Sequence, residues 1–391
     1  MPEKLPNELK YWVALSRVQG IGPRRFAILE SHFGSIENAW AGSRPDLVAA
    51  GLDARSADAI VDARKSIDVD AEWERLEREG LTAVHLRSAD YPALLREIHD
   101  PPPVLYVRGE LSPLDDRTVA VVGSRAATPY GREMARRISS GLAVSGVSVL
   151  SGLARGIDGI AHRAALDAGG KTVAVMGGGL DTIYPLEHAE LARSIVESGG
   201  ALVTEYALGM RPQAEHFPRR NRVISGLSRG VVVVEGDMKS GALLTVRWAL
   251  DQDREVFAVP GSVLSPKSSG PNWLIQQGAR LITGHEDILE ELNLAVATAG
   301  KNGNSEAESA LEGVDILARE NNQEGADGRI LALMVRADGP MQVDEITRSL
   351  GLPAPEVSSS LTLLELRGAI RQTGPMMFIL DPGWAKKVRR A

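Results

Sequence analysis

Three glycine-rich turns carry the chemistry that this sequence shows most directly. Each follows a short apolar run: Gly123-Ser124-Arg125 follows TVAVV, Gly152-Leu153-Ala154-Arg155-Gly156 follows VSVLS, and Gly177-Gly178-Gly179 follows TVAVM. Glycine lets a ligand approach the backbone, and the N-terminus of a following helix presents free N–H groups that favour an anion. Because arginines stand in two of the three turns, the pattern predicts a phosphate-binding face.

The spacing of these turns excludes the familiar nucleotide-binding motifs. Gly123 is followed by Ser124, Arg125 and two alanines, so G-x-G-x-x-G is absent at the first strand, and the P-loop pattern G-x-x-x-x-G-K-[ST] occurs nowhere. We therefore predict no nicotinamide binding, no P-loop ATP hydrolysis and no cofactor.

The segment PQAEHFPRRNRVISGLSRG, which starts at Pro212, offers a different set of contacts. Arginines give forked donors to phosphate oxygens, and a phenylalanine ring can stack on an unpaired base. Alternatively, the ring lies in the core and the arginines pair with Glu205, Glu215 or Glu235. We expect a mixed outcome, in which one arginine is structural and the others face a ligand. The candidate residues of this segment are Phe217, Arg219, Arg220, Asn221 and Arg222.

The remaining polar candidates do not suggest catalysis. Ser240-Gly241 precedes a predicted helix and could form a fourth anion-contacting turn, but no histidine has a positional claim to act as a base for Ser240. Asp158 and His162 stand four apart on a predicted helix, which favours a hydrogen bond or a cap over a metal pair, since a third ligand is missing. We predict no catalytic residue and no metal site.

Short β-branched runs alternate with helix-length amphipathic stretches from Thr118 to about Leu292. Continuous apolar strands separated by helices predict a parallel sheet covered on both faces. The fold class is therefore α/β, a Rossmann-like, doubly wound domain whose ligand lies outside the carboxyl ends of the strands.

The flanking segments predict three further parts. Residues 1–80 indicate a helical SAM-like or helix-hairpin-helix-like domain, in which the turn Gly20-Ile21-Gly22-Pro23 either faces a DNA phosphate or is an ordinary turn. The sheet domain with its extended connector spans 81–294, a polar linker spans 295–325, and 326–391 has the helix and hairpin pattern of a winged helix.

Composition is that of a folded protein without an export signal. Of the 391 residues, 43% are hydrophobic and 24% charged, cysteine is absent, and the net charge is −7. No apolar run is long enough for a signal peptide or a membrane span, so we expect a cytoplasmic protein with no membrane contact. The negative charge argues against indiscriminate coating of nucleic acid. Positive charge is nevertheless concentrated locally, at Arg117, Arg125, Arg132, Arg136 and Arg137.

Beyond the separate motifs, the sequence resembles the DprA/Smf DNA-processing family. The matching strings run in family order through residues 118–284: VGSRAATPYG, SGLARGIDGIAHRAAL, TVAVMGGGLDTIYPLEH, TEYALGMRPQAEHFPRRNRVISGLS, VVVVEGDMKSGALLT, FAVPGSV and GPNWLIQQGA. The resemblance implies an extended Rossmann fold that dimerises and binds single-stranded DNA without catalysis. It also implies handing that DNA to the recombinase RecA in natural transformation or recombination, with displacement of single-strand-binding protein.

By motif position, the resemblance also implies the DNA-binding residues. The phosphate turns would be formed by Gly123, Ser124, Arg125, Gly152, Arg155 and Gly156, the next loop by Gly179, Asp181 and Tyr184, and the pocket rim by Phe217, Arg219, Arg220, Asn221 and Arg222. Asp181 would otherwise brace its own loop. Family members often carry a basic residue soon after the Tyr-Pro pair, whereas here Pro185 is followed by Leu186, Glu187 and His188.

Two alternative functions are kept open. Related Rossmann-like folds hydrolyse nucleoside monophosphates, so the chain could be a small-nucleotide sensor or hydrolase, although the PGGxGTxxE signature of such enzymes is absent. The winged helix could read duplex DNA, but its helix pair carries a balanced mixture of Arg348, Arg367, Glu356 and Glu365, which favours contact with a protein.

Overall fold

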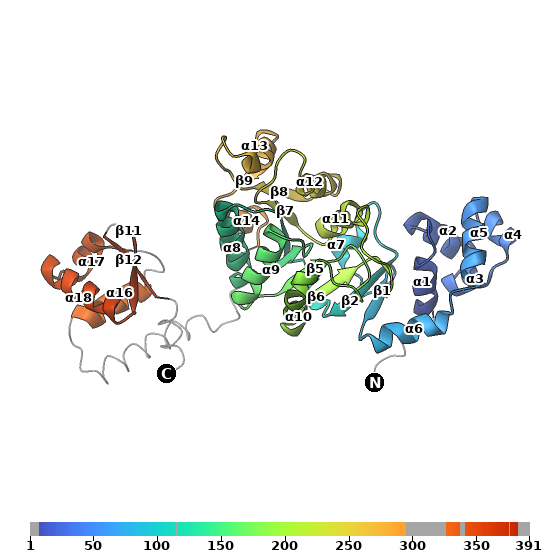
Figure 1. Cartoon of the computed structure of the whole chain (residues 1–391), viewed down its shortest axis with the longest axis horizontal. Coiled ribbons are helices and arrows are strands. Elements are labelled where there is room, and N and C mark those ends of the chain that lie inside the picture. The colour runs from blue at the N-terminus through green and yellow to red at the C-terminus, as the bar shows by residue number, and fades with distance from the viewer. Residues whose placement is uncertain (1–7, 115, 295–325, 337–340, 375, 382–391) are drawn as a thin grey trace. The chain divides into compact units, whose positions relative to one another are not determined.

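The computed structural model describes residues 8–114, 116–294, 326–336, 341–374 and 376–381 (Figure 1). The chain divides into two compact units, Met1–Val296 and Ala297–Ala391. The predicted linker 295–325 lies outside the described residues, and the predicted boundary at residue 80 falls inside the first unit. That boundary stays a prediction.

The first unit begins with helices: α1 (Leu9–Ser16), α2 (Pro23–Phe33), α3 (Ile36–Ala41), α4 (Arg44–Ala49), α5 (Ala54–Ala63) and α6 (Val69–Arg78). Pro23 is the first residue of α2, as its fixed φ predicts. Side chains of Ser35, Ser43, Asp53 and Asp68 cap four of the helices. The helices bury Trp12, which stacks on Phe26 with ring centroids 5.1 Å apart.

A nine-stranded sheet follows, in the order β1-β2-β6-β5-β4-β3-β7-β8-β9. The strands from β6 to β9 in this order pair in parallel, whereas β2 is antiparallel to β6 and to β1. Their bounds are β1 (Thr82–His85), β2 (Val104–Gly109), β3 (Thr118–Val122), β4 (Ser148–Ser151), β5 (Thr172–Val175), β6 (Ala201–Thr204), β7 (Gly230–Val233), β8 (Glu255–Ala258) and β9 (Arg280–Leu281). The predicted doubly wound α/β fold is confirmed, and two antiparallel strands extend it through a segment that the sequence indicated only as a connector.

Alternate residues of each buried strand face opposite layers of helices. On β3, Val119 and Val121 pack with α8, α9 and α14, while Ala120 and Val122 pack with α11, α12 and α13. The helices and short 3-10 turns of this region are α7 (Ala93–Arg96), η1 (Ser112–Leu114), α8 (Pro129–Val144), α9 (Ile157–Asp167), η2 (Leu186–His188), α10 (Ala189–Glu197), α11 (His216–Gly226), α12 (Ala242–Asp251), η3 (Pro266–Ser268), α13 (Ser269–Gln276) and α14 (Glu286–Glu291).

The second unit has the predicted winged-helix architecture. Its elements are α16 (Ala326–Arg336), β10 (Met341–Gln342), α17 (Val343–Leu350), α18 (Ala354–Leu366), β11 (Ile370–Gly374) and β12 (Met377–Leu380). The strands form a separate antiparallel sheet in the order β10-β12-β11, over a core that includes Ile330, Ile346 and Leu361. Among all the described residues, none of the helices is both long and apolar enough to cross a membrane.

Candidate nucleic-acid interface

The sheet changes direction of winding between β3 and β7. From β3, the chain adds β4, β5 and β6 on one side, then returns to add β7, β8 and β9 on the other. The loops after β3 and β7 therefore diverge, and ligands of doubly wound folds bind at this point. A cavity of about 730 Å³ lies here, and its lining includes Gly123, Ser124 and Arg125 after β3 and Ser240 and Gly241 before α12. The first and fourth predicted turns thus share one cavity with Ala154 of the second turn, whereas the triplet Gly177-Gly178-Gly179 does not line it.

The first two glycine turns are interlocked. The amide of Ile157 donates to the carbonyl of Ser124 at 3.2 Å, which ties the start of α9 to the turn after β3. Gly156 has a φ of +76°, and a Cβ at this position would lie 2.2 Å from the Ser124 carbonyl oxygen. Only glycine fits there. The two glycine turns are consequently held as one backbone surface.

Arg125, Phe217 and Tyr184 lie together in the lining of the cavity. The Arg125 guanidinium lies over the Phe217 ring, 5.7 Å from its centroid, and that ring is tilted against Tyr184 at 5.5 Å. Tyr184 is 49% exposed, and all three side chains line the cavity. Gly177 makes room for this arrangement, since a Cβ there would lie 3.1 Å from the Phe217 ring. A base can stack on such aromatic faces while Arg125 contacts a phosphate.

Arg220 lines the same cavity and is only 4% exposed. Its guanidinium donates to the carbonyl of Gly152 at 2.8 Å and to the carbonyl of Val175, so it joins α11 to the ends of β4 and β5. Burial lowers the pKa of Arg220 to about 10, although the nearby Asp158 opposes the change. The Asp158 carboxylate accepts from the amides of Gly152 and Ala154, and burial raises its pKa. The Arg220 guanidinium and the Asp158 carboxyl are thus both fixed in the cavity lining, near one another.

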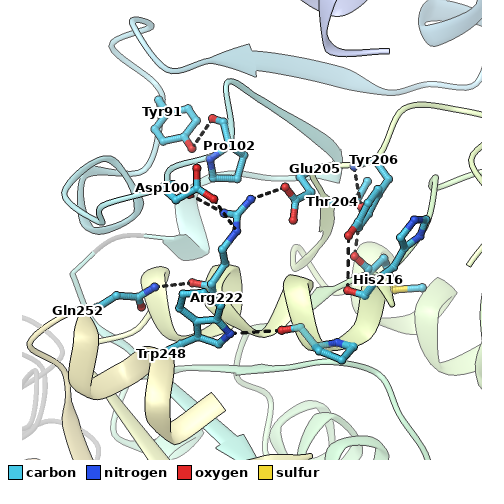
Figure 2. Close-up of polar contacts among 12 residues, drawn as sticks. Tyr91, Asp100, Pro102, Thr204, Glu205, Tyr206, His216, Arg222, Trp248 and Gln252 are labelled. Carbon is cyan, nitrogen blue, oxygen red and sulfur yellow. Dashed lines mark hydrogen bonds and ion pairs between the residues drawn. The ribbon is translucent and has the colours of Figure 1, made fainter. Parts of the chain in front are cut away.

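Arg222, two residues further along α11, is buried in the interior, where its contacts are drawn in Figure 2. It is 2% exposed, forms an ion pair with Glu205, and donates to the carbonyl of Asp100 at 2.7 Å. The backbone carbonyl of Arg222 accepts from Gln252 at 3.1 Å, which adds α12 to the network. Arg222 cannot reach a ligand from this position, and we place it among the structural residues.

The other predicted residues divide between the cavity and its supports. Asn221 lines the cavity and donates to the Gly241 carbonyl at 3.3 Å. Arg155 makes two 2.8 Å hydrogen bonds to Glu187, so its guanidinium is paired with the acidic residue that follows the Tyr-Pro pair. Arg219 is exposed and has neither a described ion pair nor a place in the described cavities.

Gly179 and Asp181 hold their loop rather than the cavity. The amide of Gly179 donates to the Met210 carbonyl, and the Asp181 carboxylate accepts from the Gly209 amide and pairs with Arg75 at 3.2 Å. Neither residue lines the cavity described above. These contacts favour a structural role for Asp181, which braces its own loop, over a role in DNA binding.

His162 is buried beside Thr172, with Nδ1 and Oγ1 2.7 Å apart, and does not contact Asp158 in the described hydrogen bonds. Burial lowers the pKa of His162 to about 3. Within the described residues, no group of three or more His, Cys, Asp or Glu side chains could hold a metal ion.

Comparison with known proteins identifies the family. The family model described as DNA recombination-mediator protein A matches residues 82–293. The chain belongs to this family. A second model, the DprA winged helix domain, matches residues 318–374.

Three relatives of the recombination-mediator family illustrate the extent of the likeness. Protein Smf of Escherichia coli is 43% identical over 84% of this chain and 82% of that protein. DNA processing protein DprA of Bacillus subtilis is 45% identical over 55% of this chain and 72% of that protein. The X-ray structure of DprA from Streptococcus pneumoniae superposes with a TM-score of 0.63 at 35% identity, covering 72% of this chain and 97% of that chain.

Two lysines that line the cavity, Lys239 and Lys267, were not among the candidates chosen from the sequence. Lys239 stands directly before Ser240, and Lys267 comes from η3, where it pairs with Asp237 at 3.4 Å. Lys239 could have been found, because it lies beside a turn already chosen. Lys267 comes from beyond β8 and gave no local signal. With both, the charged lining contains Arg125, Arg220, Lys239 and Lys267 against Asp158 and Asp237, and so favours an anion.

Proposed function

We propose that the chain binds single-stranded DNA, independently of base sequence, in the cavity between the carboxyl ends of β3 and β7. It acts as a non-catalytic mediator that protects incoming strands and loads RecA onto them, with displacement of single-strand-binding protein, during natural transformation or recombination. We place this activity in the cytoplasm, where RecA acts. The membership of the DNA recombination-mediator family supports the biological role, and the cavity supports the ligand.

The arrangement of Arg125 over Phe217 is the observation that carries the proposal. A stacking ring and a phosphate-binding cation occupy the same opening, and the ring is tilted against the exposed Tyr184. Bases can stack there only if they are unpaired, whereas aromatic stacking and phosphate contact do not depend on base identity. This favours a single strand over a duplex and predicts little sequence preference.

Fluorescence anisotropy with labelled oligo-dT and with a duplex of the same length tests the ligand class over a salt series. We expect preference for the single strand, with the logarithm of affinity falling by about 0.7 per neutralised phosphate for each log unit of salt. Equal affinity for both ligands, or none for either, contradicts the proposal. RecA filament formation on strands coated with single-strand-binding protein tests the mediator role, with and without the chain.

A small-nucleotide function is the second candidate because the cavity, at about 730 Å³, has the size of a small-molecule site. Asp158 is the carboxyl at its floor, but two backbone amides and the Arg220 charge already surround it. Its oxygens are thus poorly placed to act as a base. Incubation with a panel of nucleoside monophosphates distinguishes the two functions, since release of base or ribose phosphate would indicate the enzyme.

We also propose that the chain forms a homodimer, for which an apolar surface near the β9 edge is a candidate. Val263 and Leu264 are each 90% exposed in the loop after β8, and Trp273 of α13 and Leu281 of β9 are also exposed. Such apolar exposure is typical of interaction surfaces. Light scattering should give a dimer mass for the intact chain and a monomer mass for Leu264→Glu. A monomeric intact chain contradicts the proposed dimer.

A further inference from the structure

A second cavity, of about 420 Å³, opens between α8 and α9 and has a lining unlike that of the first. Arg132 and Arg136 come from one face of α8, and Arg163 comes from the facing side of α9. No aromatic side chain other than the His188 ring lines it, and Asp167 is the acid in its lining. We call this cavity the arginine groove.

The arginines of the groove are not explained by internal pairing. Arg136 pairs with Glu133 only at an exposed i,i+3 position, and Arg132 donates to the Ala127 carbonyl at 3.2 Å. Arg163 is exposed, and the described residues give it no hydrogen bond or ion pair. Exposed ion pairs contribute little, and like charges at i,i+4, as at Arg132 and Arg136, disfavour the folded state. An anion in the groove would offset that repulsion.

Arg125 connects the groove to the base-stacking cavity. Its side chain lines both cavities, and also a smaller one with Tyr184 and Phe217. Gly156 and Gly159 form part of the groove wall, and a Cβ on Gly159 would lie 2.7 Å from the His188 ring. A polyanion that leaves the first cavity therefore meets Arg125 and then a succession of arginines.

We infer that the arginine groove binds the phosphate backbone of the same DNA strand whose bases stack at Phe217, so that the strand crosses Arg125 from one cavity to the other. This inference rests on the proposed function. The lining separates the two tasks: the first cavity has rings that stack on bases, whereas the groove has guanidinium groups that bind phosphates without reading sequence. The groove thus sets the length of strand that the chain engages.

Oligonucleotide length separates this inference from the proposed function. We would measure anisotropy of dT4 and dT20 over a salt series for the full chain, for Arg132→Ala/Arg163→Ala, and for Phe217→Ala. The double variant should bind dT20 more weakly, with a salt slope smaller by up to about 1.4, and should bind dT4 as the unaltered chain does. Phe217→Ala should weaken both ligands and leave the salt slope unchanged.

Two matched variants test the sign of the charge effect. Arg137→Ala removes a neighbouring exposed arginine that does not line the groove and should leave dT20 binding unchanged. Asp167→Asn removes the groove's acid and should tighten dT20 binding. If the unaltered chain binds dT20 but the double variant binds it with the same affinity and slope, the groove is not part of the path. If the unaltered chain binds neither oligonucleotide, both proposals fail.

Discussion

Arg222 and Glu205 form an ion pair that is almost fully enclosed, between α11 and the residue that follows β6 (Figure 2). Burial raises the pKa of Glu205, and the Arg222 charge opposes that change. Because α11 also carries Phe217, Arg220 and Asn221, this pair fixes the helix from which the cavity is built. The function of Arg222 is therefore to position its neighbours.

Replacing Arg222 by Met should destabilise the fold by about 3 to 5 kcal/mol, because the Glu205 charge would remain buried without a partner. Urea unfolding followed by tryptophan fluorescence measures the change. The exposed neighbour Arg219→Met should change the unfolding free energy by less than about 0.5 kcal/mol. Arg222→Met/Glu205→Gln should recover part of the loss, and additive effects of the two changes would contradict the pairing.

Phe217→Ala should weaken binding of oligo-dT by about 1 to 3 kcal/mol, or roughly 5- to 150-fold, because a base loses its stacking face. Anisotropy at constant salt measures the affinity. Phe217→Tyr keeps the ring and should bind as the unaltered chain does. An Ala variant that folds and retains full affinity would show that bases do not stack at this ring.

Six of the seven parallel strands of the described sheet, β3 to β8, could be predicted from sequence because each is a mostly apolar run, and nearly all of these runs end at glycine or a small polar residue. The seventh, β9, was missed because it consists only of Arg280 and Leu281, both exposed. Strands β1 and β2 were missed for a physical reason. They flank the triplet Pro101 to Pro103, whose restricted backbone indicated an extended connector, and their pairing depends on β6, about 100 residues later in the chain.

The roles of the three clustered arginines could not be predicted individually. Arg219, Arg220 and Arg222 have the same side chain, and successive helical residues turn by about 100°, so each faces a different environment. Those environments come from distant segments: Gly152 lies 68 residues before Arg220, and Asp100 lies 122 residues before Arg222. We expected one structural arginine and two that face a ligand, whereas the structure buries both Arg220 and Arg222 and leaves only Arg219 exposed. The packing of α11, which the sequence does not show, decides which arginine is buried.

Gly156→Ala should disrupt the two interlocked glycine turns, because its Cβ would collide with the Ser124 carbonyl oxygen. We expect both a lower melting temperature and weaker DNA binding. Gly169→Ala is the matched control, since the φ of Gly169, +75°, is close to the +76° of Gly156, but no atom lies within 4 Å of the added Cβ. That control should lose only about 1 to 2 kcal/mol from backbone strain and keep its affinity. Equal effects of the two substitutions would contradict the interlocked turns.

His162 should make stability depend on pH. Thr172 Oγ1 already donates to the Val149 carbonyl, so Nδ1 of His162 donates to Thr172, and Nε2 has no partner among the described residues. Protonating Nε2 would bury an unpaired N–H and a charge, which is why burial lowers the pKa from 6.5 to about 3.

Between about pH 6.5 and pH 3, His162 is therefore protonated in the unfolded chain but neutral in the folded chain. The stabilisation from this neutral histidine is complete above about pH 6.5 and is lost progressively as the pH falls toward about 3. Between pH 7 and pH 5, the unfolding free energy should fall by about 2 kcal/mol more in the unaltered chain than in His162→Gln. The exposed His99→Gln should follow the unaltered chain. Parallel pH profiles for the unaltered chain and His162→Gln would mean that His162 takes up a proton in the folded state.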